Sequence, residues 1–370
     1  MRPRVGFRFF TAAAAFAAAL ALSSCGVSCS AVGAEQKRPL SILSYNVLSL
    51  FDPVDDGTEY SDFSVAKGSW DEARYRRRLD NLAKVALEGT KGSVTTAGPD
   101  ILCLVEVEDR RVLEDLRDGP LKSAGYRYIA ISPAPGAAIN TGLLSRIPIA
   151  SLAAHAISGT SISRGRRNIL EAVLEVDGAR LGLLVCHWKS KLEGAEATEE
   201  ERREAAALVA SRVTALIAAD PDIGIVVCGD FNENPDEYVR VGRRYATALM
   251  PEAEARVPAG ERLLIAPGAG ETGFRGGEPV LYSPWAESDG FSYAYKGERE
   301  RIDGFLISAT LLLGGKLRYR SFSVVDAPFL LDSSGAPLPW SSYSGVGYSD
   351  HLPILLTLER AGPAQSSTSR

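Results

Sequence analysis

The stretch of residues 226–232 constrains the fold of this chain more than any other. It reads Val-Val-Cys-Gly-Asp-Phe-Asn: an apolar run meets a glycine and then delivers a carboxylate and a carboxamide two positions apart. Side chains of a strand alternate in direction, so Asp230 and Asn232 point to the same side of an extended backbone. An acid and an amide that leave the end of a buried strand together indicate a functional site.

Four other apolar runs end in polar side chains in the same way. They end at Tyr45-Asn46, Val105-Glu106, Cys186-His187 and the turn Tyr348-Ser349-Asp350-His351. The chain has three histidines, and two of them stand in these turns. We therefore expect the polar ends of several strands to meet at one rim of the fold.

The extended runs are spaced like hairpins and are interleaved with helical segments. Helical periodicity covers residues 70–88, 113–123 and 198–219. The principal strand candidates are residues 40–47, 100–108, 126–131, 140–149, 169–176, 180–186, 223–228, 301–307, 319–325 and 354–358. This order predicts an α/β (α+β) protein with two packed sheets and helices outside. We expect residues 235–290 to form loops over one rim, with a helix near residues 238–249.

The N-terminus departs from the rest of the chain. Arg2, Arg4 and Arg8 precede an uncharged apolar run over residues 9–22, which is short for a bilayer span and typical of a signal peptide. The run ends in Leu-Ser-Ser-Cys-Gly, which resembles the lipobox of bacterial lipoproteins, where the cysteine is lipidated after cleavage. The resemblance implies lipidation of Cys25 and an extracytoplasmic, membrane-anchored bacterial lipoprotein. Plain secretion and an uncleaved anchor are the alternatives.

The organisation that follows is simple. Residues 1–24 are the expected signal peptide, 25–38 a tether, 39–361 a single domain and 362–370 a disordered tail. Removal of the leader would move the formal charge from −5 to −8, so the mature protein, which we expect to be a monomer, has no general attraction for nucleic acid. Cys103, Cys186 and Cys228 each sit in an apolar run, which predicts small buried hydrophobes and no disulfide or zinc site.

The polar strand ends have the composition of a hydrolytic metal site. Together they hold four carboxylates, two amides and two imidazoles, from Asn46, Glu106, His187, Asp230, Asn232, Asp303, Asp350 and His351. Oxygen-rich sets suit a hard divalent cation such as Mg²⁺ or Mn²⁺. A cation beside a carboxylate base and imidazoles meets the needs of phosphate-ester hydrolysis, because phosphate charge must be neutralised and a water aligned.

Each residue taken alone also has an ordinary structural explanation. Asn46 suits a turn, and Glu106 with Glu108 suits a solvated strand end. Arg301 with Asp303 suits a surface ion pair. At the level of single residues these alternatives stay open.

The ordered set of motifs resembles the endonuclease/exonuclease/phosphatase superfamily, which includes DNase I-like nucleases, abasic-site endonucleases, bacterial sphingomyelinases and inositol-phosphate phosphatases. The resemblance runs from about Ser41 to Leu358 with every motif in chain order. It implies a DNase I-like four-layer αββα sandwich of two mixed or antiparallel sheets. It also implies an Mg²⁺- or Mn²⁺-dependent phosphodiesterase, most simply an extracytoplasmic endonuclease or exonuclease.

The resemblance implies a role for each matching residue. Asn46, Glu106 and Asp350 resemble the metal-side residues, with Glu106 as the principal ligand. Asp230 resembles the residue that orients or deprotonates the attacking water, and Asn232 the one that holds a phosphate oxygen. The phosphate-facing histidines correspond to His187 and His351, and Asp303 fixes the tautomer of His351. Arg167 stands where a substrate-facing arginine is common, although a solvent-facing side chain is the alternative.

The substrate stays open at this point. The His187-Trp188-Lys189-Ser190 motif departs from the tyrosine-containing motif of the abasic-site branch, so repair of abasic DNA is not expected. Nucleic acid is the first candidate, and a phospholipid or small phosphate ester the second. A catalytically silent surface lipoprotein is the third, but it would require a broken site, and every catalytic position is filled.

Lipidation of Cys25 predicts how the full-length protein partitions between detergent and water. Wild type should enter the detergent phase of a cloud-point extraction and Cys25→Ala should remain in the aqueous phase, since an acyl chain gains about 0.8 kcal/mol per buried CH₂. Equal partitioning of the two proteins would contradict the anchor.

Overall fold

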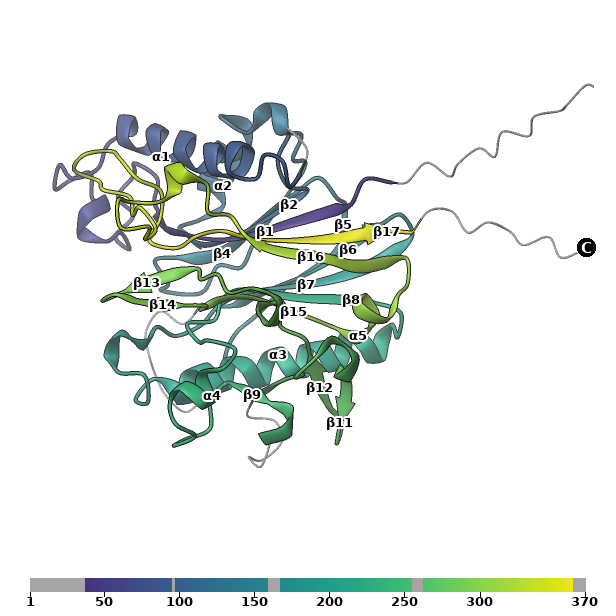
Figure 1. Cartoon of the computed structure of the whole chain (residues 1–370). Coiled ribbons are helices and arrows are strands. Elements are labelled where there is room, and N and C mark those ends of the chain that lie inside the picture. Colours follow the sequence, from purple (N-terminus) through teal and green to yellow (C-terminus); the bar gives the residue numbers. More distant parts are fainter. Residues whose placement is uncertain (1–36, 95–96, 159–166, 255–261, 362–370) are drawn as a thin grey trace, which may run out of the picture. The chain divides into compact units, whose positions relative to one another are not determined.

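Two mixed β-sheets packed face to face form the centre of the protein (Figure 1). The structure is a computed structural model that describes residues 37–94, 97–158, 167–254 and 262–361. These residues belong to one compact unit, Gln36–Arg370. The expected signal peptide, Cys25, most of the expected tether and the expected tail lie outside the described residues.

The first sheet has six strands, of which β1 and β2 are central. Its order is β16 (Leu317–Val324), β17 (Ile354–Arg360), β1 (Leu40–Leu50), β2 (Ile101–Val107), β4 (Asn140–Ser145) and β3 (Tyr128–Ile131). Strands β1 and β2 are parallel, and the other neighbours are antiparallel. The parallel pair brings Asn46 and Glu106 to the same edge of the sheet.

The second sheet has five strands and also contains one parallel pair. Its order is β15 (Asp303–Ile307), β8 (Gly224–Asp230), β7 (Ala179–His187), β6 (Ile169–Val176) and β5 (Ile149–His155). Only β7 and β8 pair in parallel among these strands, with His187 level with Asp230. Asp303 begins β15 opposite Asp230 on the other side of β8.

Alternation along the strands divides the apolar side chains between two faces. On β2, Ile101, Cys103 and Val105 face the second sheet, whereas Leu102 and Leu104 face the helices. Both faces are buried, which explains why these strands read as continuous apolar runs. The three described cysteines are buried and free, as predicted.

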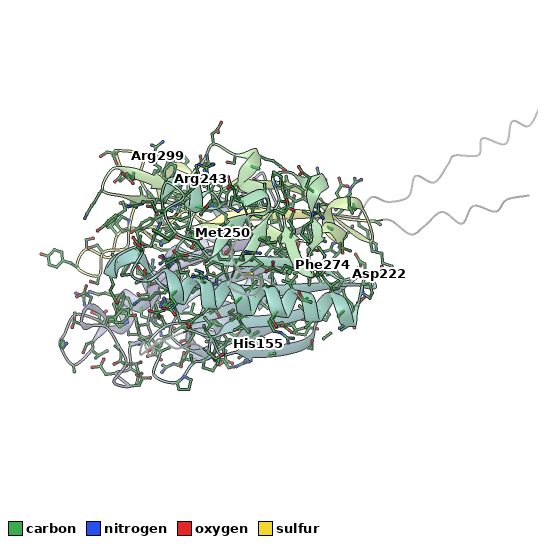
Figure 2. All side chains as sticks on the ribbon, turned by 90° about the horizontal axis from the view of Figure 1, so that it is seen from below. His155, Asp222, Arg243, Met250, Phe274 and Arg299 are labelled. Atoms are coloured by element: carbon green, nitrogen blue, oxygen red, sulfur yellow. The ribbon has the colours of Figure 1, made fainter. Side chains whose placement is uncertain are left out.

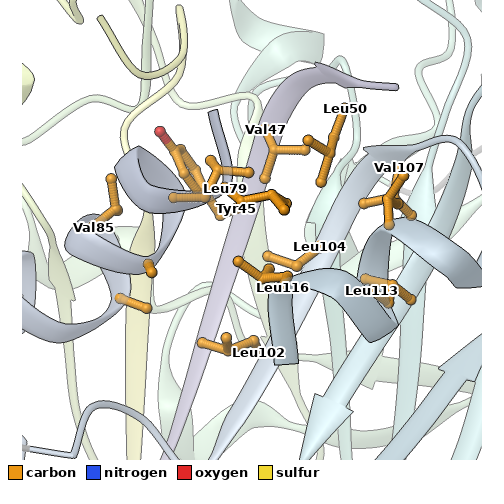
Figure 3. Packing of buried hydrophobic residues seen from close by; sticks show 14 of the residues in the cluster. Tyr45, Val47, Leu50, Leu79, Val85, Leu102, Leu104, Val107, Leu113 and Leu116 are labelled. Carbon is orange, nitrogen blue, oxygen red and sulfur yellow. The ribbon is translucent and has the colours of Figure 1, made fainter. Parts of the chain in front are cut away.

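Helices cover the outer face of each sheet. Helices α1 (Glu72–Lys84) and α2 (Arg110–Asp118) pack on the first sheet through residues such as Leu79, Leu113 and Leu116 (Figure 3). Helix α3 (Glu199–Ala219) packs on the second. Asp71 and Asp109 cap the first two helices by accepting from backbone N–H groups of the first turn. The predicted four-layer αββα sandwich is confirmed.

The segment predicted as loops is more regular than expected. It contains a four-stranded sheet of β11 (Gly273–Arg275), β12 (Glu278–Leu281), β10 (Leu263–Ile265) and β9 (Leu249–Pro251). The helix expected near residues 238–249 is the single turn α4 (Glu237–Arg240). Strands of three or four residues are too short for a periodic sequence signal, which is why they were missed.

Some of the remaining elements, among them β14 and α5, were not predicted from the sequence. Helix α1 continues into a π-helical turn (Val85–Gly89), a hairpin is formed by β13 (Tyr293–Tyr295) and β14 (Glu298–Glu300), and α5 (Ala309–Leu313) follows β15. In the described part of the chain, every helix is too short or too polar to cross a bilayer.

The position of Gly229 at the end of β8 predicts that a side chain added there destabilises the fold. Its φ is +129°, and a Cβ there would lie 1.9 Å from the carbonyl oxygen of Cys186. Gly229→Ala should therefore lower the free energy of unfolding by about 3 kcal/mol or more in urea titrations. Gly270→Ala, which has open space around it, should change it by less than about 0.5 kcal/mol. Equal stabilities would contradict the steric argument.

Candidate active site

The polar ends of the central strands of both sheets meet in one cleft of about 540 Å³. Of the residues predicted from the sequence, those that line the cleft are Glu106, Arg167, His187, Asp230, Asn232, Asp350 and His351. Asn46 and Asp303 lie just beneath and bond to the lining residues. The structure thus brings the predicted set together from segments more than 300 residues apart.

Asn46 links the two sheets. Its Nδ2 donates to Glu106 Oε1 at 3.1 Å in the first sheet and to Asp230 Oδ2 at 3.0 Å in the second. Its Oδ1 accepts the backbone N–H of Leu48 at 3.0 Å. Asn46 is therefore both a turn residue and a site residue, so the two explanations offered by the sequence coexist.

Glu106 is held in an unusual backbone conformation. Its φ is +67°, in the left-handed region that residues other than glycine seldom adopt. The β2–β4 register shifts between Val105 and Val107, so Glu106 is the bulged residue. Ser49 Oγ donates to its Oε2 at 3.0 Å. Backbone strain concentrated at a carboxylate of the cleft is typical of a functional position.

The loop after β8 holds Asp230 by one oxygen. Asp230 Oδ1 accepts the backbone N–H of Asn232 at 2.8 Å, while Asn232 Nδ2 donates to the Trp188 carbonyl at 3.1 Å. Burial, reinforced by the neighbouring charge of Asp303, raises the pKa of Asp230 to about 7. The carboxyl group is therefore tuned for proton transfer near neutral pH.

His351 forms an ion pair with Asp303. The distance from Nδ1 to Asp303 Oδ2 is 2.7 Å, and the ring of Tyr293 packs on the imidazole at a centroid distance of 4.6 Å. Burial alone would lower the pKa of His351, but the Asp303 charge and hydrogen bond outweigh it and raise that pKa well above the usual value. Nε2 of the charged ring is left to face the cleft.

His187 has the opposite protonation tendency. Its Nε2 lies 3.7 Å from Glu106 Oε1 and 3.6 Å from Asp230 Oδ2. Burial, then the charges of Arg167 and His351, lower the pKa of His187 well below its usual value. The cleft thus presents one neutral and one cationic imidazole.

Two arginines singled out by the sequence have defined partners. Arg167 lines the cleft and donates from Nε to the His187 carbonyl at 3.3 Å and from Nη2 to the Trp188 carbonyl at 3.2 Å. Arg301 donates to the Gly290 carbonyl and stacks on Trp285 at 5.5 Å, so it forms no surface ion pair with Asp303. His155 is not among the residues that line the cleft and bonds to Glu171; its position is labelled in Figure 2.

Sequence reasoning missed several residues of the cleft. Tyr60, Lys191, Tyr293 and Tyr295 all line it. Residues 291–295 read Phe-Ser-Tyr-Ala-Tyr, and nothing in this sequence shows that the hairpin folds back over His351. Lys191 is held by Glu237 at 3.3 Å and Glu300 at 3.1 Å.

The chemistry of the donor set fits a hard divalent cation. Glu106 and Asp350 keep side-chain oxygen at the cleft surface, with 16% and 36% of their side chains exposed. Asp230, Asp303 and His351 also bring possible ligand atoms within 4.8 Å of one another, but the Asp303–His351 ion pair already engages two of them. The imidazole near Glu106 is that of the neutral His187, and the Asp350 carboxylate lies 3.9 Å from His351 Nε2, farther than the 2.7 Å between Asp303 and Nδ1. Carboxylate oxygens that a cation engages less closely are the better ligands for Mg²⁺ or Mn²⁺, which favours the Glu106 and Asp350 side.

The Asp303–His351 pair predicts a titration that NMR can follow, since the chain has three histidines. In metal-free protein the His351 ring should stay protonated to higher pH than a free imidazole. Asp303→Asn removes the charge that raises the pKa, so the His351 resonance should titrate at lower pH. His155→Gln provides the assignment control. An unchanged titration in Asp303→Asn would contradict the role of the pair.

Comparisons with known proteins identify relatives of this architecture. The model of the Endonuclease/Exonuclease/phosphatase family matches residues 41–246, which carry Asn46, Glu106, His187, Asp230 and Asn232. No curated protein matches the chain.

Solved structures align over most of the chain. Truncated TDP2 of Caenorhabditis elegans is 18% identical with a TM-score of 0.50, covering 87% of this chain and 97% of its own. TDP2 of D. rerio complexed with a single-strand DNA product is 18% identical with a TM-score of 0.50, covering 87% and 99%. An endonuclease/exonuclease/phosphatase family protein of Bacteroides thetaiotaomicron is 14% identical with a TM-score of 0.50, covering 88% and 100%. At these identities the likeness shows the fold alone.

Proposed function

Because the chain belongs to the endonuclease/exonuclease/phosphatase family, whose members hydrolyse phosphoester bonds, we propose that it is a metal-dependent phosphodiesterase of nucleic acid that acts outside the cytoplasm. One observation carries the proposal. Asn46 joins Glu106 to Asp230 across the two sheets, between a neutral and a cationic imidazole. An acid poised near neutral pH beside a fixed cationic donor suits hydrolysis of an anionic ester.

Each residue of the cleft has a proposed role that follows from its position. Asp230 orients the attacking water and accepts its proton, while Asn46 and the Asn232 N–H hold the carboxylate in place. The charged His351 ring faces the phosphate, and Asp303 keeps its Nε2–H directed into the cleft. His187 offers a neutral donor, and the Asn232 amide holds a phosphate oxygen.

Glu106 and Asp350 would hold an Mg²⁺ or Mn²⁺ ion, which neutralises charge on the phosphate oxygens when bound. Asn46 positions Glu106 for this purpose through the 3.1 Å bond.

Nucleic acid is favoured as substrate by the hairpin beside His351. The side-by-side rings of Tyr293 and Tyr295 are nearly parallel, 6.3 Å apart at 15°, and Tyr295 is 44% exposed. Lys296 Nζ lies 4.9 Å from the Tyr295 ring. An exposed aromatic next to a cation suits base stacking and backbone contact in a single strand. The single-strand DNA product in D. rerio TDP2 supports the same choice.

The lipobox-like segment supports an extracytoplasmic, lipid-anchored location. A leader and a lipidated Cys25 would place the enzyme where nucleic acid is extracellular or periplasmic. The partitioning of Cys25→Ala tests this part separately from the chemistry.

Hydrolysis should depend on both the metal and the cleft residues. Residues 30–370 are offered plasmid DNA, single-stranded DNA, RNA, sphingomyelin and a small chromogenic phosphodiester, each with Mg²⁺ and with chelator. We expect turnover of nucleic acid that chelation abolishes. Asp230→Asn and His351→Gln should lower kcat by about 10²-fold or more, because each removes an acid–base or charge-stabilising group.

The control is His155→Gln, which changes a histidine outside the cleft and should keep wild-type turnover. Activity that survives chelation or Asp230→Asn would contradict the mechanism. Hydrolysis of sphingomyelin or the small diester without nucleic acid would replace the substrate, and absence of all turnover would favour a binding lipoprotein.

A further inference from the structure

Arg78 of helix α1 is a fully buried cation whose partners are backbone carbonyls. It is 0% exposed, and its two terminal nitrogens donate to the carbonyls of Val47, Leu48 and Tyr348. Among the described residues, its hydrogen bonds go to backbone carbonyls and none goes to a carboxylate. A buried charge is costly unless it is paired or hydrogen-bonded, and here three backbone carbonyls supply the hydrogen bonds.

The first carbonyl pair belongs to the turn that carries Asn46. Leu48 and Ser49 have φ of 53° and 59°, both left-handed, and this places their carbonyls and side chains in directions that a regular strand would not allow. Ser49 Oγ donates to Glu106 Oε2 at 3.0 Å. Holding this turn therefore holds both the Asn46 amide and the Glu106 carboxylate.

The third carbonyl belongs to the turn that carries Asp350 and His351. Tyr348 precedes Ser349, whose Oγ donates to the Asn46 carbonyl at 2.8 Å and accepts from the His351 N–H at 3.1 Å. One helical turn beyond Arg78, Asn81 Nδ2 donates to the Gly347 carbonyl at 2.9 Å. Helix α1 therefore forms two hydrogen bonds to the same turn, one from Arg78 and one from Asn81.

The charge of Arg78 also acts on the cleft. Its guanidinium lies 5.2 Å from the ring centre of Trp340. Burial lowers the pKa of Arg78 to about 10, while Tyr45, Asp350 and Glu106 act in the opposite direction. The group stays charged at neutral pH and offsets part of the repulsion between the two cleft carboxylates.

We infer that Arg78 is a positioning residue that sets the spacing between the Asn46–Glu106 turn and the Asp350–His351 turn, and with it the geometry of the metal-side carboxylates. The metal part of this inference rests on the proposed function. A planar guanidinium reaches both turns with separate nitrogens, whereas a lysine ammonium is a single point donor. Arg78→Lys therefore keeps the charge and loses the spacing.

The test compares three variants with wild type. Arg78→Lys is the test variant, Leu79→Ala is a buried control that destabilises the same helix, and Arg76→Met removes an exposed arginine of that helix. Hydrogen exchange is measured on metal-free protein for peptides covering residues 46–51 and 347–352. Mn²⁺ binding is measured by calorimetry without substrate.

In Arg78→Lys we expect exchange in both peptides to rise about tenfold or more together, and Mn²⁺ affinity to fall about tenfold. Leu79→Ala should speed exchange in α1 with little change in the ratio of the two turns to the core, and Arg76→Met should change neither quantity. Exchange in the two turns that matches Leu79→Ala would overturn the inference and leave Arg78 a stabilising residue only.

If Arg78→Lys does not fold, Arg78→Gln takes its place, because a single amide group cannot bond both turns as the two terminal nitrogens do. Exchange should rise in at least one of the peptides 46–51 and 347–352 relative to the core, and unchanged exchange in both would overturn the inference. Failure of wild type to bind Mn²⁺ or hydrolyse any ester would refute the proposed function, but the exchange result on the metal-free turns would still stand by itself.

Discussion

The hydrogen bonds of the Asn46 carboxamide are the interaction on which the cleft depends. One nitrogen donates to a carboxylate of each sheet, 3.1 Å to Glu106 and 3.0 Å to Asp230, at a position that is almost inaccessible to water. Hydrogen bonds to charged groups contribute about 1.5–3 kcal/mol, and an unpaired buried partner costs a similar amount. The Asn46 hydrogen bonds therefore connect the two sheets at the same rim that holds the candidate site.

Burying several carboxylates close together around Asn46 costs free energy, which other interactions in the fold must offset. Burial, and then the neighbouring charge of Asp303, raise the pKa of Asp230 to about 7. His351 compensates from within the cleft and Arg78 from beneath it. Left-handed backbone at Glu106 and Asn232 adds strain. A structure that keeps like charges together and tolerates strain in one place fits a site selected for chemistry at some expense of stability.

Much of this could be read from the sequence because strand alternation is local. Apolar runs that stop at Asn46, Glu106, His187 and Asp230 predict a shared rim once two parallel pairs are assumed, and the third and fourth layers follow from helical periodicity. The resemblance to a known family implied the four-layer order, which the structure confirms, and the roles that we propose for individual residues.

Other features depend on contacts that a linear pattern does not encode. Arg78 sits in the run Arg76-Arg77-Arg78, and only the fold separates one buried cation from two neighbours. The small sheet within residues 249–281 uses strands too short for periodicity. Nothing in the spacing of Tyr293 shows that its ring rests on His351, 58 residues later in the chain. These contacts are set by tertiary packing, which overrides local preference.

The position of the divalent cation is the central feature of the proposed site. Anomalous diffraction from a crystal soaked in Mn²⁺ tests this most directly, because the ion is located without reference to any substrate. We expect a peak within coordination distance of Glu106, in the cleft that Asp350 also lines. A peak confined to the separate acidic cluster of Asp52, Glu108 and Asp109, with none beside Glu106, would contradict it.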